Sequence, residues 1–94
     1  MSLGLLTLEI HLPGCNSLKE KRSRLKPLLA RLHREFNISA AEIDCNDAWQ
    51  AAVLGCALVS SDPAHTQRAR SEVPRWIESN WHDVSLIEYN IELF

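Results

Sequence analysis

A strand pattern changes to a helix start within the stretch LLTLEIHLPGCNSLKE, residues 5 to 20, and this change decides the fold. From Leu5 to Leu12 the residues alternate between two sides, one of them wholly apolar, as in a half-buried strand. Pro13-Gly14 ends that strand. Ser17 and Glu20 then form a capping box, in which a hydroxyl and a carboxylate bind free amides at a helix start. The stretch therefore predicts a strand followed directly by a helix.

The predicted helix carries one apolar stripe and ends near Asn37. Its leucines and a phenylalanine fall within about 100° of arc at the helical repeat, which indicates a face packed on the core. Pro27 lies inside the helix, removes one backbone hydrogen bond and predicts a local kink. The stripe consists of Leu18, Leu25, Leu28, Leu29, Leu32 and Phe36.

Two further strands, a second helix and a last strand follow. Strands are predicted over Ile38 to Cys45 and over Gln50 to Ser60, and the second is apolar on both sides, as a central strand is. Asp62-Pro63 is a cap followed by proline at a first helical position, so a helix is predicted from there to about Asn80. The segment from Val84 to Leu93 is the last predicted strand, with Ile87, Tyr89, Ile91 and Leu93 on one side.

This βαββαβ order predicts an α+β fold, the ferredoxin-like split βαβ sandwich. Counted along the chain, the four antiparallel strands are expected in the order 4-1-3-2, with both helices on one face. A chain of 94 residues is short, so residues 1 to 94 are expected to form a single domain. The two-sided apolar character of Ala51 to Val59 predicts a homodimer, because two helices cover only one face of the sheet.

Composition and single residues favour a cytoplasmic protein without catalytic machinery. The three cysteines are widely spaced, which indicates neither disulfides nor a zinc site, and Cys15 is read as a plain loop cysteine or as a reactive thiol before a helix. No membrane span or leader peptide is visible. The four histidines are scattered, and no catalytic constellation appears. We expect no metal, no cofactor and no enzymatic activity.

Basic residues gather on the first predicted helix. Seven of the ten lysines and arginines lie between Ser17 and Glu35, although the net charge of the chain is −2. Cations near a helix start oppose the helix dipole, so an anionic partner is one explanation and a solvated helix face is the other. The residues predicted to bind RNA or another anion are Lys19, Lys21, Arg22 and Lys26.

Trp49 and Gln50, beside the turn between the two middle strands, are predicted to bind a partner. The Trp49 ring is read as a partner anchor, as a base stacker, or as an aromatic that closes the hairpin against the domain. The open sheet face lacks the aromatics of an RNA-reading platform, since its central positions include Thr7, Glu9 and Gly55. Acidic margins around an apolar middle suit self-association better, and Glu42, Asp44, Glu88 and Glu92 are expected at those margins.

Three segments together resemble the YlxP-like family, a bacterial domain of unknown function. They are IHLPGCNSLKEKR (residues 10 to 22), NISAAEI (37 to 43) and DAWQAAVLG (47 to 55). The resemblance implies a ferredoxin-like fold and a gene often placed among those for translation initiation and ribosome maturation. It brings no catalytic residues.

The leading hypothesis is a non-enzymatic accessory factor that binds structured RNA, ribosomal RNA in particular, through the basic helix. One alternative is a protein–protein adaptor whose basic helix meets an acidic partner. Another is a small-ligand-binding ferredoxin-like dimer. Retention of RNA that weakens as salt rises separates the first hypothesis from the adaptor.

Overall fold

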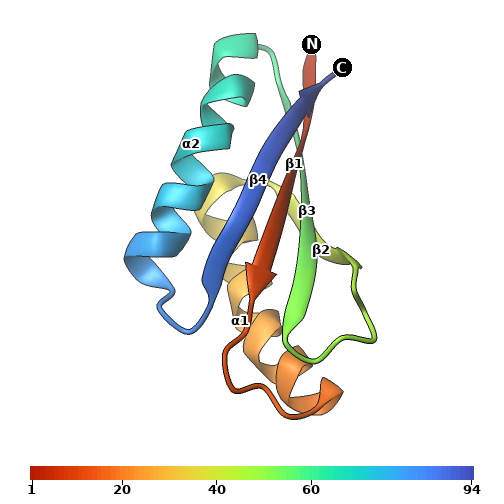
Figure 1. Cartoon of the computed structure of the whole chain (residues 1–94). Helices are drawn as coiled ribbons and strands as arrows, with labels where there is room; N and C mark the ends of the chain where they lie inside the picture. Colours follow the sequence, from red (N-terminus) through yellow and green to blue (C-terminus); the bar gives the residue numbers. More distant parts are fainter.

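A computed structural model describes residues Met1 to Phe94 as one sheet covered by two helices (Figure 1). The chain order is βαββαβ, as predicted. The elements are β1 (Ser2–His11), α1 (Leu18–Phe36), β2 (Ser39–Asp44), β3 (Ala51–Ser60), α2 (Pro63–Asn80) and β4 (Ser85–Leu93). Neither helix is long and apolar enough to cross a membrane.

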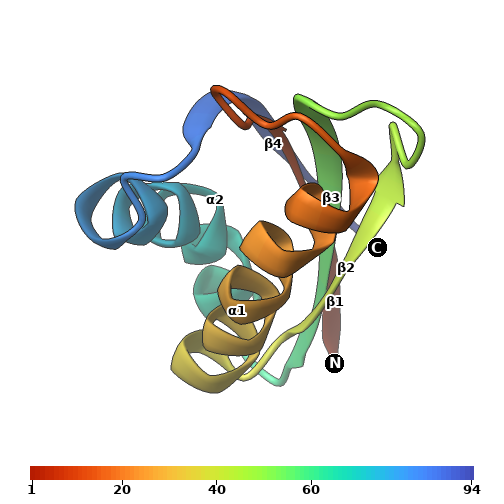
Figure 2. The same cartoon turned by 90° about the horizontal axis from the view of Figure 1, so that it is seen from below.

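The sheet has the predicted topology. Its strands are antiparallel in the order β2-β3-β1-β4, which is the order 4-1-3-2 read from the other edge. Figure 2 shows α1 and α2 side by side on the same face of the sheet. The prediction of an α+β ferredoxin-like sandwich with one open sheet face is therefore confirmed.

Both helices begin and end at the residues that the sequence indicates. The Ser17 hydroxyl accepts from the Glu20 amide at 3.0 Å, and the Glu20 carboxylate accepts from the Asn16 amide at 3.1 Å, so the pair caps the first turn of α1. Asn37 ends α1 in the left-handed conformation, with φ 52° and ψ 48°. At α2 the Asp62 carboxylate accepts from the amide of Ala64 at 3.0 Å. Pro27 and Pro74 lie inside helices that continue past them.

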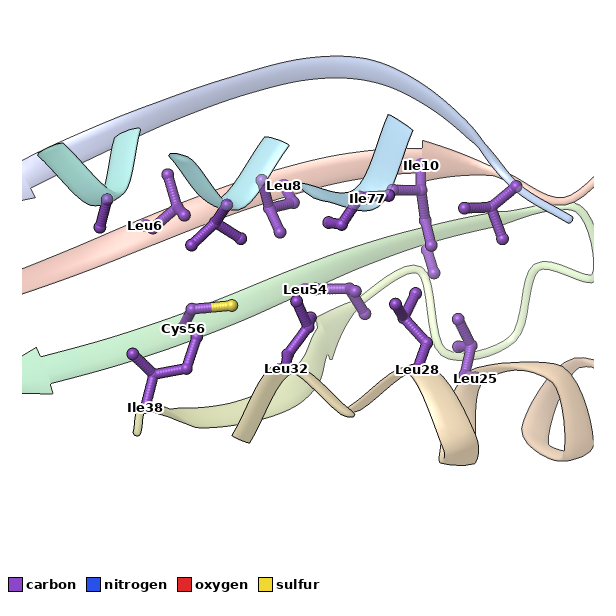
Figure 3. Close-up of a cluster of buried hydrophobic side chains, with 14 of the residues drawn as sticks. Leu6, Leu8, Ile10, Leu25, Leu28, Leu32, Ile38, Leu54, Cys56 and Ile77 are labelled. Atoms are coloured by element: carbon purple, nitrogen blue, oxygen red, sulfur yellow. The ribbon is translucent and has the colours of Figure 1, made fainter. Parts of the chain in front are cut away.

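The core lies between the helices and one face of the sheet (Figure 3). Leu6, Leu8 and Ile10 of β1 are almost completely buried there. They meet the α1 stripe and Ile77 of α2 in one cluster of 17 buried apolar residues. Burying a leucine or isoleucine side chain stabilises a fold by about 1.5 to 3 kcal/mol, so this cluster fixes the helices on the sheet.

Gly4 lets α2 approach β1 closely. A Cβ atom at this position would lie 2.6 Å from Cγ2 of Thr66, a residue that is fully buried on α2. That separation is shorter than carbon atoms tolerate, so only glycine fits unless α2 moves. The N-terminal half of α2 therefore packs on the backbone of β1.

Two β-bulges change which side chains face the core. In β4, Glu88 pairs with Glu9 and Leu86 pairs with Ile10, which leaves Ile87 as the extra residue. Leu86 consequently packs on the core, and Ile87 is 60% exposed. The prediction that Ile87 lies on the same side of the strand as Tyr89 is therefore wrong. In β2, Ile43 is the extra residue between Glu42 and Asp44.

Candidate functional site

Lys21 is buried and ties α1 to the loop between β2 and β3. Its side chain is 1% exposed, and its ammonium donates to the carbonyls of Cys45 at 2.6 Å and Ala48 at 2.7 Å. The same group pairs with the Glu42 carboxylate at 2.5 Å. The ammonium thus has two carbonyl acceptors and one carboxylate at ion-pair distance. Lys21 therefore works as an internal clamp on residues 45 to 48.

The prediction that Lys21 binds RNA or another anion is wrong, because the side chain points into the protein. The reason is its place on the helix. Lys21, Leu25, Leu28 and Leu32 follow the spacing i, i+4, i+7, i+11, which is one face of a helix. This spacing is the sequence signal that places Lys21 with the core stripe. Glu42 likewise lies on the helix side of the sheet, where it meets Lys21, and not at the open face as expected.

Two other cations of α1 are engaged in ion pairs. Arg24 donates from Nε to the Asp83 carboxylate at 2.8 Å and from Nη1 to the Pro13 carbonyl at 2.9 Å. The hydrogen bond to Asp83 raises the pKa of the Arg24 guanidinium above its ordinary value. These contacts join the loop before α1 to the loop after α2. Arg31 pairs with Glu35 one turn further along at 3.3 Å.

Lys19, Arg22 and Lys26 form what we call the basic face. All three side chains are exposed, and none has a carboxylate within ion-pair distance. Their spacing of i, i+3, i+7 places them on one side of α1, beside the stripe that Lys21 begins and not within it. Of the four predicted anion-binding residues, the structure thus leaves three together and free.

Trp49 is exposed on a loop that several hydrogen bonds hold in place. The ring is 53% exposed and does not belong to the hydrophobic core. Around it, the Ala48 amide donates to the Cys45 carbonyl at 3.0 Å, and the Leu12 amide donates to the Gln50 carbonyl at 2.9 Å. The Gln50 amide group donates to the Cys15 carbonyl at 3.3 Å, so this side chain already has a structural contact. Partner binding by Trp49 and Gln50 stays a prediction.

The open sheet face has an apolar part and an acidic part. Ile43 lies over Gly55, where a Cβ atom would meet it at 2.9 Å, and a shallow hollow of about 240 Å³ forms beside it between Leu5 and Ala41. Towards β4 the face is acidic, since Glu9 and Glu88 are direct cross-strand neighbours. Like charges placed opposite one another destabilise a sheet. The predicted homodimer through this face stays a prediction.

A second hollow, of about 380 Å³, lies between the end of α1 and the start of α2. Buried Ile38, Leu58 and Ala69 line it, together with His65 and two glutamates at the rim. Its volume falls in the range of small-molecule sites. Neither here nor elsewhere in the chain is a group of three or more histidine, cysteine or acidic side chains arranged to hold a metal ion.

The buried thiols are poorly placed for nucleophilic chemistry. Cys15 is fully buried and lies 3.5 Å from the Ser17 carbonyl, which favours the plain structural interpretation over the reactive thiol. Cys56 is buried in the core, and loss of hydration raises its pKa from 9.0 to about 12. A thiol with so high a pKa stays protonated at neutral pH.

The Cys56 thiol is expected to make stability fall at alkaline pH. Below pH 9 the thiol is protonated in both the folded and unfolded states, so its contribution is fully present. As pH rises from 9 towards 12 the unfolded state ionises first, and the free energy of unfolding drops by up to about 1.4 kcal/mol per pH unit. Urea unfolding of wild type and Cys56→Ala across this range measures the effect. If the free energy of unfolding falls equally with pH in the two proteins, Cys56 does not titrate in this way.

The segments that carry the sequence resemblance meet at one end of the fold. Lys21 joins residues 10 to 22 to the loop before β3, and Gln50 binds back to Cys15. Figure 1 shows the start of α1 and the β2–β3 loop at the same end of the sheet. The sequence model of the family described as "Protein of unknown function (DUF503)" matches residues 3 to 91. The chain belongs to this family.

A curated relative supports the same assignment. "Uncharacterized protein YlxP" of Bacillus subtilis (strain 168) is 38% identical over 77 residues, which cover 82% of this chain and 84% of that protein. The predicted resemblance to YlxP-like proteins is therefore confirmed. Neither the DUF503 description nor the name of the relative specifies an activity.

Proposed function

We propose that this DUF503 protein is a non-enzymatic accessory factor that binds structured RNA through the basic face of α1. The observation that carries the proposal is that Lys19, Arg22 and Lys26 are exposed, unpaired and on one side of the helix, whereas Lys21, Arg24 and Arg31 are occupied by internal or local contacts. Three of the six lysines and arginines without an ion pair thus lie on one side of α1.

The spacing of the basic face suits a phosphate backbone. Seven residues of α-helix span about 10 Å, so the three cations can reach neighbouring phosphates from one docking position. Contacts of this kind fix orientation and select no base sequence. Because the protein has a net charge of −2, the attraction has to be local to this face. The translation-related gene setting that the family resemblance implies favours ribosomal RNA and a cytoplasmic location.

The expected result is RNA binding that weakens steeply with salt. Each phosphate contact releases a counterion, and three contacts predict a loss of about 20- to 40-fold in affinity between about 50 and 200 mM salt. Fluorescence anisotropy of a labelled hairpin RNA titrated with the wild-type protein measures this loss. If the hairpin is not bound even at the low salt concentration, the RNA proposal fails and a protein adaptor becomes the better account of the basic face.

A further inference from the structure

The Lys21 clamp places the loop that carries Trp49 at the end of the molecule where α1 begins. The Lys21 ammonium binds the carbonyl of Ala48, which is peptide-bonded to Trp49, and the first turns of α1 that carry Lys21 also carry Lys19 and Arg22 on another side. A lysine stem reaches about 6 Å from the backbone, so the Ala48 carbonyl lies within about 9 Å of the helix backbone at Lys21. Figure 2, seen from below, shows the β2–β3 loop next to the first turns of α1. One exposed aromatic ring and two free cations therefore share one end of the molecule.

The exposure of Trp49 is not explained by folding. The ring is 53% exposed, although the loop that carries it is held by Lys21, by the Leu12–Gln50 backbone bond and by the Gln50 side chain. An exposed aromatic side chain on a rigid loop favours binding of a partner, because the loop loses little conformational freedom when the partner binds. More than half of the Trp49 surface is therefore open to a partner.

The surroundings of the ring favour a nucleobase over a duplex backbone. Asp44, at the end of β2, and Asp47, in the loop, are exposed and carry negative charge, which repels phosphates from the ring itself. The face of a base is uncharged and stacks on tryptophan, while the phosphates attached to it can lie towards Lys19 and Arg22. A base paired inside a duplex has no free face to offer. The exposed ring therefore matches the base of an unpaired nucleotide, and the two cations match its phosphates.

We propose that Trp49 stacks on an unpaired base of the bound RNA while Lys19 and Arg22 contact the flanking phosphates, so that the protein prefers RNA with unpaired loops to continuous duplex. This inference rests on the proposed RNA binding and deepens it, since it names the class of RNA. Lys21 has no contact with RNA in this arrangement. It is a positioning residue that holds the loop carrying Trp49.

The test compares two labelled RNAs of equal length, a hairpin with an unpaired loop and a blunt duplex. Trp49→Ala is expected to weaken binding of the hairpin by about 5- to 100-fold and to leave binding of the duplex unchanged. Trp49→Phe, which keeps a stacking ring, is expected to retain most of the affinity for the hairpin. Ile87→Ala removes an apolar side chain of similar exposure on β4 and should change neither affinity. Melting curves confirm that each variant is folded.

The outcomes separate this inference from the proposed function. If wild type binds both RNAs and Trp49→Ala binds the hairpin equally well, stacking is excluded, RNA binding by the basic face stands, and Trp49 is left as a protein contact. An equal loss for hairpin and duplex would also overturn the inference, because the ring would then act without regard to unpaired bases. If wild type binds neither RNA, the proposed function fails and the inference fails with it.

Discussion

Replacing Lys21 with methionine is expected to lower the free energy of unfolding by about 3 to 5 kcal/mol, because removal of one partner of a buried ion pair leaves the other charge without compensation. The Glu42 carboxylate, only 16% exposed, would lose its cation, and the carbonyls of Cys45 and Ala48 would lose their donor. A buried polar group without a partner costs about 1 to 3 kcal/mol. The effect should therefore exceed that of most single substitutions.

Thermal and urea unfolding measure the loss directly. A change of this size lowers the midpoint of a domain with fewer than 100 residues by more than about 12 °C. The matched control is Lys19→Met, which makes the same chemical change two residues earlier on the exposed face and should stay within about 0.5 kcal/mol of wild type. Similar melting curves for the two variants would mean that the clamp contributes little. The double variant Lys21→Met, Glu42→Met should recover part of the loss, because the unpaired charge is gone.

Reversal of the whole basic face is expected to abolish RNA binding without unfolding the protein. In the variant Lys19→Glu, Arg22→Glu, Lys26→Glu the three cations that release counterions become anions that repel phosphates. All three side chains are exposed and unpaired in the wild type, so no internal contact is lost. A glutamate in place of Lys19, in the first turn of α1, is also favoured by the helix dipole by about 0.3 to 1 kcal/mol.

Anisotropy titration and a melting curve on the same preparation check both parts of this expectation. Binding should vanish at low salt, and the melting temperature should stay equal or rise. A solvated-face interpretation of these cations predicts the same melting curve with unchanged RNA binding, so binding is the part that discriminates. A variant that binds RNA as well as wild type does would refute the role of the basic face.

Local sequence rules were sufficient for the architecture. The alternation in β1, the capping residues Ser17 and Asp62 and the helix end at Asn37 all act between near neighbours in the chain, and each has the predicted role in the structure. The strand order follows from connection rules that apply to any βαββαβ chain. For these reasons, the fold could be predicted from one sequence.

The wrong predictions concern residues whose positions depend on contacts with residues far away in the sequence. The bulges at Ile43 and Ile87 depend on how β2 and β4 align with their neighbours, and the alternation within one strand contains no information on that alignment. Lys21 looked like another surface cation because its acceptors are 24 and 27 residues away in sequence. Its spacing from Leu25 and Leu28 was the available signal, but the local concentration of positive charge obscured it.

The candidate site could be predicted only in part for the same reason. Lys19, Arg22 and Lys26 were found from charge and spacing, and they remain exposed and together. The position of Trp49 beside the first turns of α1 could not be predicted, since it depends on the buried clamp between α1 and the β2–β3 loop. Charge patterns in sequence show how many cations an element carries, whereas the structure shows which of them are already in use.

The most direct test of the basic face compares two variants with the same net charge. One is the triple reversal of Lys19, Arg22 and Lys26, and the other reverses Arg34, Arg70 and Arg75, which are also exposed and have no ion pair. At low salt, anisotropy of the labelled hairpin RNA should show binding by wild type and by the second variant, and none by the first. Equal loss in both variants would show that overall charge, and not this face of α1, governs RNA binding, and would contradict the account.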